Sequence, residues 1–392
     1  MTDNTMTRRQ MLKVSGLTAL VVGGALSVGT GARAAAAGAF SAGEGDPYEA
    51  WRSLPRDGSP QALVAAAILA ANPHNTQPWR FRSGPDGIDV IADRSRALAA
   101  TDPTGSEMVA GLGCAVENMT VAAAAAGSTA TVEMHPADAG DALARVTIAR
   151  GSAGENAALF PAILKRHTSR GPYAVDQPVA AAALAEGDAL LASLPRVQLS
   201  WLQGAERDRF GELVNQATAA VVADGAQSDE IDRWWRATRD EIERHRDGMT
   251  LDAQSLPPVT LFLGKVLPPQ TQEQNNQSWL KTTRDVHVKT AAAYGLLSVA
   301  DAGDAESQLQ VGRACQRLHL WATANGLALQ PLNQVTERIA RDRGQGRTSP
   351  LEAPLAELTP SGQTALFTFR IGHPTVEAGL SPRRRLADVV ES

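Results

Sequence analysis

Three short segments carry side chains suited to an anionic, flat and redox-active ligand. The first is the loop 73–80 (PHNTQPWR). Its two prolines restrict the backbone, and the amides of Asn75 and Gln77 can reach the edge of a heteroaromatic ring. The second is residues 165–170 (KRHTSR), and the third is the arginine run 383–385. Together they predict one binding site built from distant parts of the chain.

The second segment has the spacing of a phosphate cradle. In an extended chain alternate side chains point the same way, so Arg166, Thr168 and Arg170 would share one side. Two guanidinium groups and a hydroxyl can bind a phosphate, and the arginine run 383–385 could close over it. Each segment alone also fits a turn, a solvated basic stretch or a terminal run of charge. The prediction therefore depends on their combination.

Motifs of several other chemistries are missing from the sequence. The seven histidines are scattered, and there is no HExxH, CxxC or EF-hand string, which argues against a metal site. There is also no G-x-S-x-G elbow, no Walker A loop and no G-x-G-x-x-G after a strand. We therefore expect no metal and name no catalytic side chain.

The regular elements that would position these segments can be read from the hydrophobic pattern. The run 61–71 consists of strong helix formers and ends at Asn72-Pro73, just before the first segment. Apolar residues recur at helical spacing from 109 to 123, and Gly127 is typical of a helix stop. Strands are predicted at 88–92, 145–149, 197–202 and 364–371.

A weak internal repeat relates two parts of the chain. Residues 113–127 overlay 312–326 at an offset of 199, with agreement at five of fifteen positions, all Gly or Ala. Small residues on one helix face let two helices approach closely, which predicts a central packing helix in each half. Chance agreement in an alanine-rich chain is the alternative. In this register Cys114 and Cys315 are not equivalent, and the sequence leaves open whether they pair.

The second half contains an insertion, about 225–280, that the first half lacks. It opens with the charged stretch 228–248, for which we expect a helix ending at Gly248, and continues into a proline-rich stretch. Such a long segment is typical of a lid, an arm or a tether.

Composition excludes several classes of protein. With 392 residues, 43% hydrophobic and 20% charged, the chain can form two or three globular units and is not disordered. The formal net charge of -5 provides no basic surface, so we expect no nucleic-acid partner.

The first 34 residues predict a twin-arginine export signal, followed by a linker at 35–48. Arg8 and Arg9 precede the apolar run 14–28, which is short and glycine-rich for a bilayer core of ~30 Å. A single membrane anchor is the alternative. The mature protein would have no stable membrane span and would lie in the periplasm, the cell envelope or outside the cell.

These segments resemble those of the nitroreductase-like flavoproteins, and most closely the twin-arginine-exported, Acg-type branch with fused domains. The resemblance covers about residues 45–390. Its most specific element is NTQPW at 75–79, followed by RHTSRGPY at 166–173, PLNQ at 331–334 and the ending RIGHPTVEAGLSPRRRL at 370–386. It implies FMN as the cofactor.

The resemblance also implies three groups of FMN-binding residues. The phosphate group would be held by Arg166, Thr168, Arg170, Arg383 and Arg385. The isoalloxazine ring would lie against Pro331, Leu332, Asn333 and Gln334, whose loop points a backbone N–H at the reactive ring nitrogen. The loop from the other half would contribute Asn72, His74, Asn75 and Gln77. Two departures are Ala71-Asn72 in place of Pro-Ser, and Asn333 at a position that is commonly acidic.

The implied fold is α+β, with two nitroreductase-like halves at 49–155 and 156–392 that imitate a homodimer. Mostly antiparallel central sheets would be flanked by helices, and the insertion would be a lid over the flavin. Because NTQPW lies in the first half and the other motifs in the second, a monomer would form one complete site at the interface of the halves.

The implied activity is FMN-dependent hydride transfer to a nitro-aromatic or quinone-like small molecule, with NAD(P)H as the candidate electron donor. The alternative is a flavin storage or sequestration protein, in which the lid occludes FMN and prevents turnover with NAD(P)H. The sequence does not separate these two functions.

Overall fold

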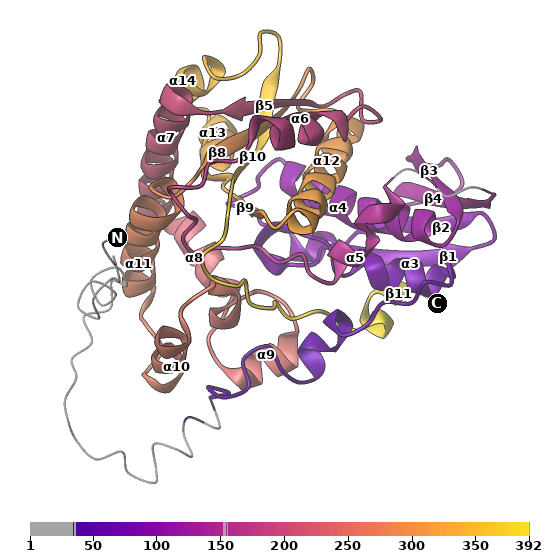
Figure 1. Cartoon of the computed structure of the whole chain (residues 1–392), viewed down its shortest axis with the longest axis horizontal. Coiled ribbons are helices and arrows are strands. Elements are labelled where there is room, and N and C mark those ends of the chain that lie inside the picture. Colours follow the sequence, from indigo (N-terminus) through magenta and orange to yellow (C-terminus); the bar gives the residue numbers. More distant parts are fainter. Residues whose placement is uncertain (1–33, 35–36, 152–153, 155, 392) are drawn as a thin grey trace, which may run out of the picture.

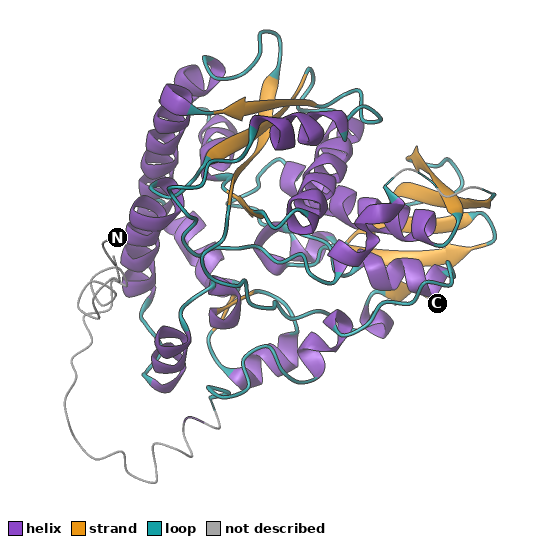
Figure 2. Cartoon of the chain, in the orientation of Figure 1, coloured by secondary structure: helices purple, strands orange, loops and turns teal. Residues whose placement is uncertain are grey.

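The computed structural model describes Ala34, residues 37–151, Gly154 and residues 156–391. The twin-arginine pair, the apolar run and all of the predicted signal up to residue 33 lie outside the described residues. The rest of the chain forms a mixed α+β structure with two main sheets, each flanked by helices (Figures 1 and 2). This confirms the predicted fold class.

The first sheet has the strand order β11-β1-β2-β4-β3. Its strands are β1 Trp79–Gly84, β2 Gly87–Ala92, β3 Ser128–Met134, β4 Ala142–Arg150 and β11 Val390–Glu391. The predicted strands 88–92 and 145–149 are thus confirmed. Neighbours are antiparallel except for β11, which runs parallel to β1 with Phe81 opposite Val390. The sequence pattern gave no sign that the last residues would join this sheet.

The second sheet is antiparallel throughout, with the order β5-β8-β10-β9. Its strands are β5 Gln198–Leu202, β8 Ala293–Val299, β9 Ala328–Pro331 and β10 Thr364–Gly372. β5 and β10 confirm two predicted strands. All seven residues of β8 are buried, which explains its continuous apolar sequence. At Gly295 a Cβ atom would lie 2.1 Å from the ring of Phe369, so glycine is needed for this strand pair.

Two long helices cross between the sheets, α4 (Ser106–Ala125) and α12 (Ala305–Ala324), as Figure 1 shows. Each begins and ends 199 positions from its counterpart. A Cβ atom on Gly113 would lie 2.1 Å from the carbonyl oxygen of Leu309, and one on Gly312 would lie 1.9 Å from that of Ala110. The repeated glycines are therefore the crossing point, which supports the interpretation of the repeat as a pair of central packing helices.

The two cysteines lie at this crossing, where both are buried and free. The thiol of Cys114 donates to the carbonyl of Gly312, with Sγ and O separated by 3.2 Å. The hydrogen bond of the Cys315 thiol to Cys114, together with burial, raises the pKa of Cys315 well above its ordinary value. The Cys315 thiol therefore stays protonated, and both buried side chains pack as small groups in the helix interface.

In the described part of the chain, α4 is the one helix that is long and apolar enough to be a membrane-span candidate, and 83% of its apolar window is buried inside the protein. It also carries the fully buried Glu117. This carboxylate accepts from Arg317 at 2.6 Å and from Arg313 at 3.0 Å, both on α12. The burial and the ion pairs identify α4 as a core helix that joins the two halves.

The remaining helices of the two halves cover the sheets. They are α3 Pro60–Ala67, α5 Phe160–Ile163, α6 Ala181–Ala189, α7 Gly204–Ala223, α13 Gln334–Gly344 and α14 Glu352–Ala356. α3 is shorter than the predicted helix 61–71. After Ala67 the chain continues in tight turns, in which the amide of Leu69 donates to Ala66 and that of Ala70 to Ala67. This leaves the carbonyls of Leu69 and Ala70 available to side chains.

The insertion folds into several short elements, seen in the lower part of Figure 1. They are α8 Gly225–Arg233, β6 Trp235–Arg236, α9 Arg239–His245, β7 Met249–Thr250, α10 Pro258–Val266 and α11 Gln272–Thr282. The predicted continuous helix over 228–248 is wrong. β6 pairs with β7 and interrupts it, and Thr238 and Glu241 form a capping box that starts a new helix.

Candidate functional site

Two buried arginines from distant segments meet at one tryptophan. Arg166 follows α5, and Arg383 lies in the C-terminal segment that leads to β11. Their guanidinium carbons lie 5.8 and 4.6 Å, respectively, from the ring centroid of Trp51. Their exposed fractions are 2% and 3%, and neither has a carboxylate partner among the residues that the structure describes. Trp51 lies outside every motif in the sequence.

The turns after α3 orient both guanidinium groups. Arg166 donates through Nη2 to the carbonyl of Leu69 at 3.0 Å, and Arg383 donates through Nη2 to that of Ala70 at 3.4 Å. Arg383 also donates through Nη1 to Oδ1 of Asn75 at 2.8 Å. The Nε atoms of both arginines are buried and have no hydrogen-bond partner within the described ranges. Each arginine therefore keeps a donor that the protein itself does not use.

The charges at this position are uncompensated. Burial lowers the pKa of Arg383 well below its ordinary value, and the charge of Arg166 lowers it further. Burial lowers the pKa of Arg166 to about 10, with a contribution from Arg170. The acceptors around Arg383, which also include Oγ of Ser381 at 2.8 Å and the carbonyl of Pro382 at 2.9 Å, are neutral. Buried cations without a neutralising charge are unfavourable, so this arrangement is suited to binding a multiply charged anion.

Further polar groups of the segment 166–170 lie beside the two arginines. The ring of His167 packs edge-on against Trp51, with centroids 4.5 Å apart. Burial, Arg166 and Arg383 lower the pKa of His167 to about 3, so this imidazole is neutral. Its Nδ1 atom and the hydroxyl of Ser169 are buried without a partner in the described structure, and Thr168 is half-buried.

Arg170 is held by the insertion. Its Nη1 donates to the carbonyl of Ala253 at 3.0 Å, and its backbone N–H donates to Oγ of Ser255 at 3.1 Å. Burial and the charge of Arg170 lower the pKa of His74 to about 4, so this histidine of the first half is neutral. The insertion therefore contacts the predicted cradle directly.

The amides of the 72–77 loop hold neighbouring backbone. The side chain of Asn72 accepts from the amide of Gln77 at 2.7 Å. The side chain of Gln77 donates to the carbonyl of Arg246 and accepts from the amide of Arg384, both at 2.8 Å. We expected Gln77 at a ring edge. In the structure it ties the loop to the insertion and to the C-terminal segment.

Asn75 has a similar positioning role. Its Nδ2 donates to the carbonyls of Gly248 and Pro382 at 3.1 and 3.0 Å, while its Oδ1 receives Arg383. His74 and Asn75 have positive φ angles of 47° and 55°, which are uncommon in non-glycine residues. The loop conformation is thus fixed by contacts that also fix Arg383.

The loop 331–334 connects β9 to α13. The amide of Leu332 donates to the carbonyl of Thr368 at 2.9 Å, and Oδ1 of Asn333 accepts from the amide of Thr368 at 2.9 Å. Gln334 begins α13, and its Oε1 is buried without a partner among the described residues. The amide of Leu332 is already used, so Asn333 and Gln334 supply the backbone donors of this helix N-terminus.

Two carboxyl groups that sequence reasoning missed lie on α4 and α13, the helices next to the predicted ring loops. Glu107 is one helical turn before Gly111, where α4 contacts Asn72 and Pro73. Burial raises the pKa of Glu107 well above its ordinary value, and the negative charge of Glu337 raises it further. Burial also raises the pKa of Glu337 to about 7. No motif contains these residues, because only the meeting of α4 and α13 brings them together.

The arginine run 383–385 does not act as one cluster. Arg383 joins Arg166, whereas Arg384 donates to the carbonyls of Gln77 and Trp79 at 3.2 and 3.3 Å. The Arg385 side chain is 59% exposed and lies 3.8 Å from a carboxylate oxygen of Asp46. The structure therefore does not bring Arg385 to the other predicted cradle residues.

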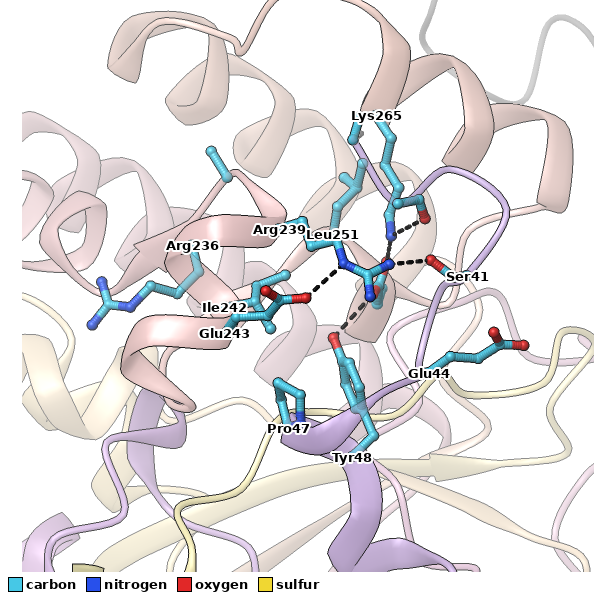
Figure 3. Close-up of a pocket in the computed structure, with 14 residues that line it drawn as sticks. Ser41, Glu44, Pro47, Tyr48, Arg236, Arg239, Ile242, Glu243, Leu251 and Lys265 are labelled. Atoms are coloured by element: carbon cyan, nitrogen blue, oxygen red, sulfur yellow. Dashed lines mark hydrogen bonds and ion pairs between the residues drawn. The ribbon is translucent and has the colours of Figure 1, made fainter. Parts of the chain in front are cut away.

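An N-terminal strap, residues 37–51, covers this region and is bound to the insertion (Figure 3). Asp252 of the insertion accepts from the Tyr48 hydroxyl at 3.0 Å and forms an ion pair with Lys265. Lys265 also donates to the carbonyl of Gly38 at 3.1 Å. The cavity enclosed here has a volume of about 30 Å³, which suits water molecules and is far too small for a flavin.

Comparisons with known proteins agree with the resemblance stated from the motifs. No family model matches the chain. The chain is 28% identical over 344 residues to a Mycobacterium tuberculosis (strain H37Rv) protein named "Putative NAD(P)H nitroreductase Rv3131", covering 84% of this chain and 90% of that protein. It is 40% identical over 76 residues to "Putative NAD(P)H nitroreductase acg" of the same strain, covering 19% and 23%.

Among solved structures, the FMN-dependent nitroreductase NfnB from Mycobacterium smegmatis, in complex with NADPH, matches with a TM-score of 0.40 and 15% identity. The match covers 60% of this chain and 98% of that chain. The two sequence relatives confirm the resemblance to the nitroreductase-like flavoproteins and to their Acg-type branch.

Proposed function

We propose that this protein is an FMN-dependent oxidoreductase of nitroreductase type, with the flavin bound where the two halves meet. The main support is the pair of buried arginines, Arg166 and Arg383, which have no carboxylate partner in the described structure. A phosphate monoester would supply the negative charge and the acceptor oxygens with which these guanidinium groups can pair. When bound, FMN would supply the two-electron chemistry.

The other predicted residues fit this ligand in different ways. Arg170 and Thr168 would complete the phosphate cradle, and His167 would remain neutral beside it. The N-terminus of α13, at Asn333 and Gln334, would present backbone donors to the polar edge of the ring. Asn75 and Gln77 would act by holding Arg383 and the C-terminal segment in place. An NAD(P)H donor and a nitro-aromatic or quinone-like acceptor complete the proposal.

Flavin storage is the second candidate, and the strap favours it. Residues 37–51 are bound to the insertion through Asp252, and the insertion in turn holds Arg170. A ligand beneath both would exchange slowly and leave little access for a nicotinamide. The two functions share the same cradle and differ in whether NAD(P)H can reach the ring.

Removing the cradle charges tests FMN binding. We expect Arg166→Gln and Arg383→Gln each to weaken FMN binding by roughly 10- to 100-fold, since hydrogen bonds to a charged group contribute about 1.5–3 kcal/mol. Riboflavin, which lacks the phosphate, should be affected much less. Arg385→Gln is the matched control, because its side chain is exposed, and it should bind FMN as the parent protein does. Equal losses for FMN and riboflavin would contradict the cradle.

Anaerobic mixing separates the two functions. If the protein is an oxidoreductase, NADPH or NADH will bleach the flavin absorbance, and a nitro compound will restore it. If it stores flavin, dithionite will bleach the flavin while neither nicotinamide does so.

We also propose that the protein is exported by the twin-arginine route, as its first 34 residues predict. Fractionation of cells that express the full chain should find the shortened protein outside the cytoplasm. Arg8→Lys with Arg9→Lys should retain it inside at full length.

A further inference from the structure

His287 lies where the insertion rejoins the second half. It belongs to a π-helical turn, Thr283–Val288, that directly follows α11. Such turns are rare and are often found at functional sites. The side chain of His287 is deeply buried, with an exposed fraction of 4% for the residue. No sequence motif includes it.

The ring of His287 is fixed by the backbone of the predicted cradle. Its Nε2 lies 3.1 Å from the carbonyl oxygen of Arg170. A carbonyl can only accept, so we assign the proton to Nε2. Burial lowers the pKa of His287 well below its ordinary value, and the charges of Arg370 and Arg170 lower it further. The imidazole is therefore neutral, and its Nδ1 is a hydrogen-bond acceptor.

This acceptor has no donor among the residues that the structure describes. A buried acceptor without a donor costs about 1–3 kcal/mol. The backbone cannot readily move to relieve it, because Arg370 donates to the carbonyl of His287 at 3.4 Å and to Oγ1 of Thr290 at 3.2 Å. His74, which is also neutral, has an unpartnered buried Nδ1 as well.

We propose that His287 is a ligand-binding residue whose Nδ1 accepts a hydrogen bond from a hydroxyl group of the bound molecule. This inference rests on the proposed function and deepens it. A neutral acceptor repels phosphate oxygens and attracts a donor, so His287 suits the polyhydroxylated chain that joins the phosphate of FMN to its ring. The arginines would then bind the anionic end, and His287 would recognise the adjacent hydroxyls.

The test measures binding of FMN and of riboflavin to the full-length chain by fluorescence titration. Both ligands carry the same hydroxyl chain, but riboflavin has no phosphate. We expect His287→Phe to weaken both by the same factor, roughly three- to tenfold, as for one neutral hydrogen bond. The ratio of the two affinities should stay unchanged. His287→Gln, whose amide oxygen can accept, should recover part of the loss.

A second measurement does not depend on any variant. In protein with ¹⁵N-labelled histidine, the His287 Nδ1 resonance should shift when FMN is added, and it should shift equally with riboflavin. Unchanged affinities in His287→Phe together with an unmoved resonance would overturn the inference. A loss confined to FMN would instead assign His287 to the phosphate. Failure of the parent protein to bind FMN would be a failure of the proposed function itself.

Discussion

At the scale of single residues, the site combines charges that the fold alone does not need. Arg166 and Arg383 are buried side by side, and each has an unused Nε donor in the described structure. Two like charges buried together without an anion destabilise the folded protein. Binding of an anionic ligand should therefore stabilise it. Binding and stability should therefore respond in opposite directions to changes at these positions.

Arg166→Met should show this opposition. We expect the free energy of unfolding without FMN to rise by about 0.5–2 kcal/mol. Such gains are common when a residue that serves function but destabilises the fold is replaced. FMN binding should weaken in the same variant. Urea unfolding with and without FMN measures both effects. A loss of stability in the ligand-free protein would mean that Arg166 serves mainly to cap the turns after α3.

The carboxyl pair predicts a pH dependence of stability. Burial raises the pKa of Glu337 in the folded protein from its ordinary 4.5 to about 7, so the folded state binds this proton more tightly than the unfolded state does. Its contribution is complete below the unfolded value and is lost as pH rises through 7. The charges of Asp102 and Glu230 also raise the pKa of Glu337, whereas a hydrogen bond with Glu107 lowers it.

We therefore expect the free energy of unfolding to fall as pH rises from about 5 to about 7.5. Glu337→Gln should make this part of the profile flatter, because glutamine does not titrate. Chemical unfolding at several pH values checks this. An identical slope in the variant would show that the pair does not hold a proton at neutral pH.

At the scale of elements, the crossing of α4 and α12 joins the halves. The position of Gly312 leaves no space for a methyl group, because the nearest atom is a backbone oxygen of the other helix. Two helices cannot approach this closely with larger residues at the contact.

Gly312→Ala should destabilise the protein by about 1–3 kcal/mol or more, since overpacking must push the helices apart. Gly225→Ala is the control. This glycine begins α8 and has open space around it, so alanine should be neutral or slightly stabilising there. Thermal unfolding compares the two. Similar stability of both variants would show that the helices can separate freely.

Some elements and site residues could be predicted from the local sequence pattern, and others depend on tertiary contacts. Alternation in the strands and spacing in α4 depend on local residues, so the sequence predicted them. The break between α8 and α9 depends on pairing of Trp235–Arg236 with Met249–Thr250, which the helical pattern does not reveal. Motifs indicated Arg166 and Arg383, but Trp51, His287 and Glu337 reach the site through tertiary contacts alone.

At the scale of the whole molecule, the strap and the insertion form one cover. Asp252 accepts from the buried Tyr48 of the strap and pairs with Lys265 of the insertion, and Lys265 in turn donates to the carbonyl of Gly38 in the strap. Removing one partner of a buried ion pair costs about 3–5 kcal/mol, because the other charge stays buried without a partner. Such a loss should act locally, since the two sheets lie elsewhere in the molecule (Figure 1).

Asp252→Asn should speed amide hydrogen exchange in residues 37–51 and 249–266, and it should speed FMN release. Exchange in β8 and β10 should stay unchanged, which provides the internal control. Tyr48→Phe removes one hydrogen bond and keeps the ion pair, so it should give a smaller effect in the same peptides. Equal exchange in all three proteins would show that this contact does not close the site.

The strand β11 has a consequence for synthesis. Its partner β1 is synthesised some 300 residues earlier, so this edge of the first sheet stays unpaired until residues 390–391 have been made. The first sheet is therefore completed only after the second half has been made, although domain-by-domain folding is usual for chains of this size. Loss of residues 390–391 would leave the edge of β1 free to pair with other chains and would favour aggregation.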